Sequence, residues 1–357
     1  MPKRLPPGAV RSLISIIQFL CQKDSVRAEP TVCSEDCHAR SDGGMEAEMQ
    51  EVDAVIRRRL ASEVVLIDQI SKYIIGAGGK RIRPLLVLLF SRALGFQGAE
   101  RFELAATVEF IHTATLLHDD VVDESDLRRG RKSANAIFGN AASILVGDFV
   151  YSRAFQMMVS VNRMKVLQVL SDATNVIAEG EVLQLMNMHD ADLQVDDYLK
   201  VIRFKTAKLF EASARLGAVL ANATEDIEEA CADYGRSLGT AFQLIDDLLD
   251  YEGSTQDLGK NVGDDLREGK PTLPLLLAMQ RGTSAEKELI RSAIQRGEIE
   301  RLADVIEVVR RTGALQATRD AARQQVEHAK QRLTLLPQSI YRDALIELCT
   351  NSVDRSS

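Results

Sequence analysis

Two acidic stretches decide how this chain should fold and what it could bind. The first, LLHDDVVDESDLRRG, occupies residues 116–130, and the second, QLIDDLLD, occupies residues 243–250. Both lie in apolar surroundings, so we expect each on a buried helix, where the first and last acids of a DDxxD pattern share one face. Stacked like charges repel unless a hard cation lies among them, and Mg²⁺ takes oxygen ligands that it commonly shares with substrate phosphates. Two such helices facing each other would form a clamp for metal and diphosphate.

The apolar pattern around these stretches is helical from about Met45 onward. Residues 55–74 and 104–116 repeat apolar side chains at three- and four-residue steps. Gly and Pro cluster between such segments, as in residues 76–79 and 253–274. The pattern predicts one all-α domain over residues 45–357, a bundle of at least about ten helices whose central members are apolar all round and therefore buried.

Bulk composition excludes several classes of protein. The chain has 357 residues and a net charge of −8, which argues against a nucleic-acid binder with a basic face. No apolar run reaches the roughly 18 residues that a membrane-spanning helix needs. Five cysteines without regular spacing argue against a disulfide framework and favour a reducing compartment, so we expect a cytoplasmic protein.

The first 44 residues differ from the rest of the chain. A basic start followed by the apolar residues 12–21 is similar to a secretory signal, but Gln18 interrupts the run and no clear cleavage site follows. Cys33 and the pair Cys37-His38 would supply half of a zinc site, and no second pair of ligands stands nearby. We interpret residues 1–44 as an irregular N-terminal extension.

A glycine-rich basic segment, GGKRIRP, occupies residues 78–84. Glycines allow the backbone to approach a ligand closely. Lys80 and Arg83 would supply positive charge at the start of a helix, and Pro84 suits the first helical turn. The segment indicates either a phosphate site or a basic helix cap beside a loop.

Further cations lie at the end of the first acidic stretch and between the two stretches. Arg128 and Arg129 could reach phosphate groups or form ion pairs within their own helix. Lys205 lies in an apolar helical stretch, where a buried lysine needs a carboxylate or a ligand phosphate as partner. Residues 258–274 read as a mobile flap in which Lys260 could cover a bound diphosphate, or as an ordinary polar loop.

Taken together, these motifs resemble the trans-polyprenyl diphosphate synthases, over the chain from Met45 to its end. The basic segment, the DDxxD with its following Arg-Arg, the Lys-Thr at residues 205–206 and the second DDxxD occur in the family's order and spacing. Residues 109–140 and 235–276 are most similar to the bacterial octaprenyl diphosphate synthases. The resemblance implies an isoprenoid-synthase-type helical bundle around a deep central cavity, usually a homodimer.

The resemblance also implies an activity and roles for individual residues. A Mg²⁺-dependent prenyltransferase would condense isopentenyl diphosphate with an allylic diphosphate such as farnesyl diphosphate. The implied magnesium ligands are Asp119, Asp123, Asp246 and Asp250. The implied contacts to the allylic diphosphate come from Arg128, Lys205, Thr206, Gln243 and Lys260, and those to isopentenyl diphosphate from Lys80, Arg83, His112 and Arg129. Catalysis would depend on Asp119, Asp120, Asp123, Asp246 and Lys205.

The length of the product should depend on the helix that carries the first acidic stretch. Ala114 and Thr115 lie one turn before the acids, both are small, and one turn rises about 5.4 Å, close to one isoprene unit. This open turn favours a long, all-trans product, which we expect to be octaprenyl diphosphate (C40), for quinone side chains. Deeper residues would form the floor, with Phe110, Phe155 and Met158 as candidates for either floor or plain core. Release of so apolar a product implies a transient membrane contact.

Other readings of the same residues stay open. A shorter- or longer-chain synthase would keep every motif. A terpene cyclase would not need the basic segment at residues 78–84, and a non-catalytic subunit of a heteromeric synthase would be expected to lose acids that are intact here. A helical scaffold without activity would leave two buried groups of like charges unexplained.

Overall fold

The computed structural model describes residues 44–76, 78–128, 130–252, 262–297 and 299–354, and these are almost wholly helical. The α-helices are α2 (Met45–Leu60), α3 (Val65–Gly76), α4 (Ile82–Ala93), α5 (Glu100–Val122), α6 (Ala134–Phe138), α7 (Asn140–Ser160), α8 (Met164–Asn187), α9 (Val195–Ile202), α10 (Lys208–Leu220), α11 (Glu225–Glu252), α13 (Asp264–Arg267), α14 (Leu273–Arg281), α15 (Ser284–Arg296), α16 (Leu302–Arg311), α17 (Ala314–Arg332) and α18 (Ile340–Val353). A π-helical turn η1 (Arg203–Ala207) and a 3₁₀ turn η2 (Leu333–Leu335) join neighbouring helices. The β-structure of the described ranges is one hairpin of β1 (Leu127–Arg128) and β2 (Arg131–Lys132), with Leu127 opposite Lys132. The predicted all-α fold is confirmed.

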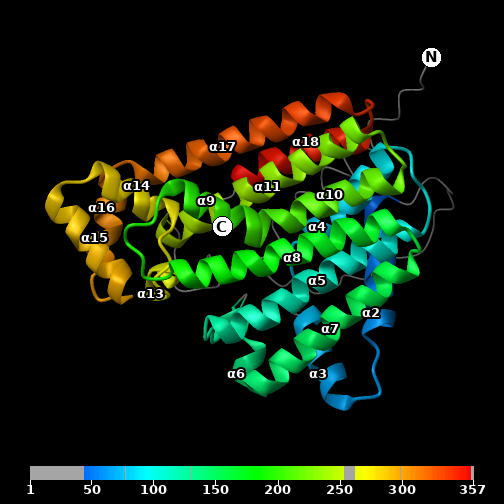
Figure 1. Cartoon of the computed structure of the whole chain (residues 1–357), viewed down its shortest axis with the longest axis horizontal. Helices are drawn as coiled ribbons and strands as arrows, with labels where there is room; N and C mark the ends of the chain where they lie inside the picture. The colour runs from blue at the N-terminus through cyan, green and yellow to red at the C-terminus, as the bar shows by residue number, and fades with distance from the viewer. Residues whose placement is uncertain (1–43, 77, 129, 253–261, 298, 355–357) are drawn as a thin grey trace, which may run out of the picture.

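Helix α4 lies at the centre of the bundle. Ten of its twelve residues are buried, which is the outcome expected for a helix that is apolar on every side. It packs against α2, α5, α10 and α18. The long helices α5, α8, α10, α11 and α17 run along the long axis of the molecule (Figure 1). The two acidic stretches, near the ends of α5 and α11, therefore lie in a region that the central helices enclose.

Helices α10 and α11 approach closely because α11 carries glycines where the two touch. A Cβ on Gly235 would lie 2.4 Å from the carbonyl oxygen of Phe210, and a Cβ on Gly239 would lie 2.6 Å from Cα of Ala207. Any larger side chain would force the helices apart. Since Ala207 ends the π-helical turn, this contact fixes the turn opposite the second acidic stretch.

A second, smaller core joins the end of the bundle. Its buried residues come mainly from α14, α15 and α16, which gather at one end in Figure 1. Tyr251 of α11 is fully buried in this core and so ties it to the central helices. The segment between α13 and α14 leads from this core to the central cavity, which Lys270 and Thr272 line.

Several predictions fall on parts of the chain that the structure does not describe. Residues 1–43, with Cys33, Cys37 and His38, lie outside the described residues, as do Arg129 and Lys260. Within the described residues, no helix combines the length and apolar character that crossing a membrane requires.

Candidate active site

The two acidic stretches meet in one cavity of about 590 Å³. Residues of α4, α5, α8, α9, α10 and α11 line it, together with the segment that follows α13. Asp119 and Asp123 lie on one wall and Asp246 and Asp247 on another. Residues more than 120 positions apart in the chain therefore share a cavity, as the facing-helix hypothesis requires.

The first acidic wall is the end of α5. The helix ends at Val122, one residue before the last acid of the motif, and the amide of Asp123 still donates to the carbonyl of Asp119 at 2.8 Å. The helical relation of Asp119 to Asp123 is thus kept by a capping residue. Lys205 Nζ lies 3.7 Å from Asp119 Oδ2, and Lys270 Nζ lies 3.1 Å from Asp123 Oδ2.

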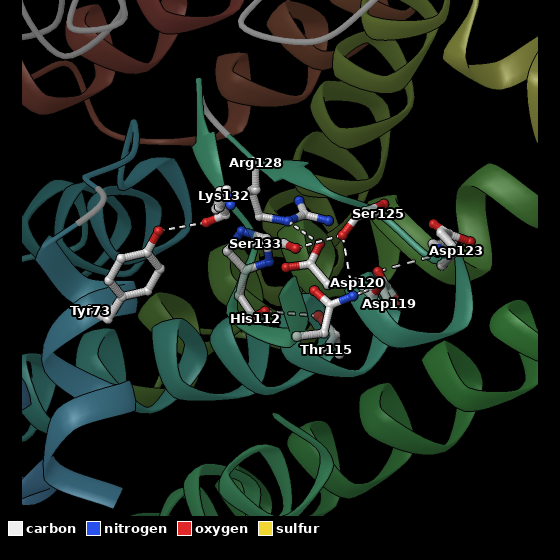
Figure 2. A network of polar contacts seen from close by, with 12 residues as sticks. Tyr73, His112, Thr115, Asp119, Asp120, Asp123, Ser125, Arg128, Lys132 and Ser133 are labelled. Carbon is white, nitrogen blue, oxygen red and sulfur yellow. Dashed lines mark hydrogen bonds and ion pairs between the residues drawn. The ribbon is translucent and has the colours of Figure 1, made fainter. Parts of the chain in front are cut away.

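Asp120 faces away from these two acids. Its carboxylate is buried and accepts from Nε of Arg128 at 2.5 Å, and Figure 2 shows Asp120 beside Arg128 while Asp123 lies apart from them. Burial raises the pKa of Asp120, although the charge and hydrogen bond of Arg128 act in the opposite direction. Asp120 therefore holds Arg128 at the cavity wall.

The short β-hairpin after α5 holds Arg128 in place. The hydroxyl of Ser133 donates to the carbonyl of Ser125 at 2.5 Å, and Asn135 Nδ2 donates to the carbonyl of Asp120 at 2.9 Å. From α3, the hydroxyl of Tyr73 donates to the carbonyl of Lys132 at 2.5 Å (Figure 2). These bonds close the hairpin onto the end of α5, and the sequence did not predict it.

The second acidic wall, on α11, is built differently. Asp247 is buried, and its carboxylate accepts from the hydroxyl of Tyr198 at 2.5 Å and from Gln243 Nε2 at 2.8 Å. Burial, reinforced by the charge of Asp265, raises the pKa of Asp247 to about 8. Asp246 is exposed towards the cavity.

A relay of neutral groups connects this wall to the π-helical turn. The hydroxyl of Thr206 donates to Oε1 of Gln243 at 2.9 Å, and Gln243 in turn donates to Asp247. Asp250 is buried and accepts from the amide of Asp265 at 3.2 Å. Thr206 and Gln243, both expected at a diphosphate, thus lie at the cavity, whereas Asp250 lies behind its wall.

The basic segment before α4 forms a third side of the cavity. Gly78 and Gly79 have φ angles of 75° and 141°, which other residues rarely adopt. Lys80, Arg83 and His112 line the cavity, and the guanidinium of Arg83 lies 4.5 Å from the centre of the Phe210 ring. The predicted residues of the basic site that the structure describes are thus brought together.

Arg81 between them has a different environment. Its φ angle of 48° is unusual for a residue with a side chain. Its Nη1 donates to Oε1 of Glu109 at 2.6 Å, and both side chains are largely buried. This ion pair holds the turn that places Lys80 and Arg83 on either side of it.

The sequence did not single out Glu181, Tyr198, Asp265 or Lys270, which all line the cavity. Glu181 of α8 accepts from Nζ of Lys205 at 2.5 Å, and burial raises its pKa to about 7. Tyr198 donates a hydrogen bond to Asp247, and the charge of Asp265 contributes to the raised pKa of Asp247. Burial alone would lower the pKa of Lys270, but the carboxylates of Asp123 and Glu268 outweigh it and raise the pKa. For Lys270 a signal existed, because it stands in the glycine-rich segment where Lys260 was chosen instead.

The donors at the cavity suit a hard divalent cation. Asp119, Asp123 and Asp246 present carboxylate oxygens, and Lys205 and Lys270 already lie against two of these acids. Among the described residues, no three His, Cys, Asp or Glu side chains converge closely enough to hold a metal by themselves. A cation bound here would take its remaining ligands from water or from a bound substrate, which is the habit of Mg²⁺.

The residues proposed to set product length lie in two environments. Thr115 lines the cavity, whereas Ala114 is fully buried outside the lining. Of the floor candidates, Phe110 and Met158 are buried, but Phe155 is 38% exposed on the surface of this single chain. Phe155 is therefore not enclosed by the fold of one chain.

Comparisons with known proteins bear on the family of this chain. A sequence model described as polyprenyl synthetase matches residues 64–310. The chain is 55% identical to the octaprenyl diphosphate synthase of Escherichia coli K12, over 86% of this chain and 96% of that protein. It is 45% identical to an all-trans-nonaprenyl-diphosphate synthase (geranyl-diphosphate specific) of Rhodobacter capsulatus, over 85% and 94%. A polyprenyl synthase of Caulobacter crescentus CB15, solved with calcium and isoprenyl diphosphate, superposes with a TM-score of 0.85 at 49% identity, over 87% of this chain and 96% of that one.

Proposed function

This chain belongs to the polyprenyl synthetase family, and on that premise we propose that it is a Mg²⁺-dependent synthase whose product is all-trans octaprenyl diphosphate. Enzymes of this family are trans-prenyltransferases that elongate an allylic diphosphate with isopentenyl diphosphate. The observation that carries the proposal is the meeting of two acidic walls and a separate basic loop at one cavity. An octaprenyl product is supported by the identity of 55% to an octaprenyl diphosphate synthase.

The two diphosphates would occupy opposite sides of the cavity. On the allylic side, Asp119 and Asp123 face Asp246 across a space that Arg128, Lys205, Thr206 and Gln243 also border, with Asp250 behind the second wall. On the other side, Lys80, Arg83 and His112 would hold isopentenyl diphosphate. Arg129 and Lys260, proposed for the same sites, lie outside the described residues.

The residues of the chain would orient the reaction and exclude water. Bound Mg²⁺ would neutralise the allylic diphosphate and make it a better leaving group. As diphosphate leaves with the electrons of its C–O bond, Lys205 and Arg128 would stabilise its growing charge. The double bond of isopentenyl diphosphate then forms the new C–C bond, and a proton passes to the departed diphosphate. The apolar helices around the cavity would keep water from the allylic cation.

The same proposal covers assembly, location and extent. We propose a cytoplasmic location and a homodimer, and the homodimer is supported by the exposed apolar side chains Leu145 and Val159 of α7 and Val182 and Met186 of α8. Residues 45–357 would form the catalytic unit and residues 1–44 an extension. The product would enter quinone (ubiquinone) synthesis after a transient contact with a membrane.

One incubation tests the main proposal. Purified protein is mixed with isopentenyl diphosphate, farnesyl diphosphate and Mg²⁺, and the chain lengths formed are read by mass spectrometry. A sharp peak at C40 is expected. A peak at C15 to C20 would overturn the octaprenyl assignment but keep the chemistry, whereas no elongation would favour a subunit that needs a partner.

A substitution tests the path of the growing tail. Ala114→Tyr places a ring five residues before Asp119, about 7.5 Å along the helix, and is expected to shorten the product. Mass spectrometry of the products gives the answer. Full-length product from this variant would show that the tail follows another path.

A further inference from the structure

One lysine at the cavity is shared unequally between two carboxylates. Nζ of Lys205 lies 2.5 Å from Oε2 of Glu181 and 3.7 Å from Oδ2 of Asp119. The first distance is a direct charge-assisted hydrogen bond, and the second is a looser ion pair. Small movements of one ammonium group therefore decide which carboxylate it neutralises.

The backbone around this pair is built for close approach. Glu181 follows Gly180 on α8, and a Cβ on Gly180 would lie 2.6 Å from the amide nitrogen of Lys205 and 2.9 Å from the carbonyl carbon of Phe204. The backbone of α8 thus touches the π-helical turn that carries Lys205. Single π-helical turns of this kind occur often at functional sites. The contact places Glu181 beside Lys205 through the main chain and not only through flexible side chains.

Two further carboxylates add negative charge beside the pair of Glu181 and Lys205. Burial is the largest cause that raises the pKa of Glu181 to about 7; the charges of Asp119 and Asp123 add to it, and Lys205 opposes it. Besides Glu181, Asp119 offers Lys205 a carboxylate within ion-pairing distance. An ammonium pulled onto Asp119 would occupy an oxygen that a divalent cation needs.

We infer that Glu181 is a positioning residue, which holds Lys205 on the α8 side of the cavity and thereby keeps Asp119 available for the metal and its diphosphate. This inference rests on the proposed function. Glu181 itself needs no contact with substrate, because it acts through Lys205. Partners of this kind, one layer behind a metal ligand, typically change metal affinity or activity by about 10–100-fold when they are removed.

Binding of a non-reacting substrate analogue tests the inference without turnover. Farnesyl thiodiphosphate is titrated into the full chain by calorimetry at several Mg²⁺ concentrations, for the wild type and for Glu181→Gln. The variant is expected to need about 10-fold or more Mg²⁺ for half-maximal binding. The KM for isopentenyl diphosphate, measured in parallel, is expected to stay unchanged because Lys80 and Arg83 lie on another side of the cavity.

A matched control and a double variant isolate the path through Lys205. Glu179→Gln alters an exposed acid two residues away on the same helix, whose partner is Asn175, and should bind as the wild type does. In a Lys205→Gln background, Glu181→Gln should add no further loss, because the residue through which it acts is gone. Circular dichroism checks folding, and Glu181→Asp replaces Glu181→Gln if the latter does not fold.

The outcomes separate this inference from the proposed function. If the wild type binds the analogue with Mg²⁺ but Glu181→Gln binds equally well, the inference fails and the function stands. An additive loss in the double variant would also overturn it, because Glu181 would then act independently of Lys205. If the wild type does not bind the analogue at all, the proposed function fails first.

Discussion

The acids at the end of α5 lie among cations, whereas the buried acid of the matching motif on α11 is held by neutral donors. Arg128, Lys205 and Lys270 each lie against one acid of the first motif. Asp247 of the second motif instead accepts from a tyrosine hydroxyl and a glutamine amide. The two stretches share one DDxxD pattern, so their neighbours alone create the difference.

This difference bears on the pKa of the buried acid in each motif. Burial raises the pKa of Asp247 to about 8, so this acid tends to hold a proton near neutral pH. On the first wall, burial also raises the pKa of Asp120, but there the charge and hydrogen bond of Arg128 oppose the rise. A repeated motif therefore does not imply two equivalent sites.

The largest expected effect comes from the first wall. Asp119→Asn removes a carboxylate that faces the cavity and should lower kcat by about 10²–10³-fold at saturating Mg²⁺, because charge stabilisation of the leaving group is lost. Steady-state kinetics measure the change, with circular dichroism to check folding. Asp126→Asn, which alters an exposed acid just beyond the motif, is the control. An Asp119→Asn enzyme that retained more than about a tenth of the wild-type kcat would remove this wall from the chemistry.

Tyr198→Phe should act on the second wall and mainly on stability. The substitution leaves the buried carboxyl of Asp247 without one of its two donors and should lower the free energy of unfolding by about 1–3 kcal/mol. Urea denaturation of the metal-free protein measures it. Tyr151→Phe, at a half-buried ring of α7, serves as the comparison of equal chemistry. Equal urea midpoints for Tyr198→Phe and Tyr151→Phe would show that the hydrogen bond from Tyr198 does not stabilise the buried Asp247.

The pH dependence of stability should also single out Asp247. Its pKa is about 8 in the folded chain against an ordinary value of 3.8, so the folded state binds the proton more tightly. Its contribution to the free energy of unfolding is therefore fully present below pH 4 and is lost as the pH rises towards 8. Asp247→Asn should flatten this fall in metal-free protein, measured by urea denaturation at pH 6 and pH 8. If Asp247→Asn loses as much unfolding free energy between pH 6 and pH 8 as the wild type, the loss comes from other groups. Glu181, whose pKa is raised in the same direction, is one of them.

The smallest effect is expected in the hairpin that supports the first wall. Tyr73→Phe removes one exposed hydrogen bond to Lys132 and should cost about 0.5–1.5 kcal/mol in the free energy of unfolding. The affinity for the allylic substrate should hardly change, because Asp120 still holds Arg128. Thermal unfolding and the KM for farnesyl diphosphate check both points. A large rise in that KM would mean that α3 contributes to holding Arg128.

Much of the fold and of the site follows from local pattern. Helical periodicity predicted the all-α bundle with buried central helices, because a helix that is apolar on every side must be surrounded, and α4 is such a helix. The cations that belong to contiguous motifs, Lys80 and Arg83, were found for the same reason: glycine and charge stand together in the sequence. Lys270 stands in the same glycine-rich segment as Lys260, but its pairing with Asp123, 147 residues away, does not follow from local pattern.

The sequence by itself determined that acids and cations gather in four motifs, since their spacing is a property of the chain. The tertiary structure decided which of them meet and in what charge state. The burial of Asp247 beside Tyr198, the hold of Asp120 on Arg128, and the placing of Glu181 beside Lys205 all arise where helices distant in sequence touch. Their physical reason is shared: pKa values and ion pairs depend on solvent exclusion and on neighbours within a few ångströms, and neither can be read from spacing along one chain.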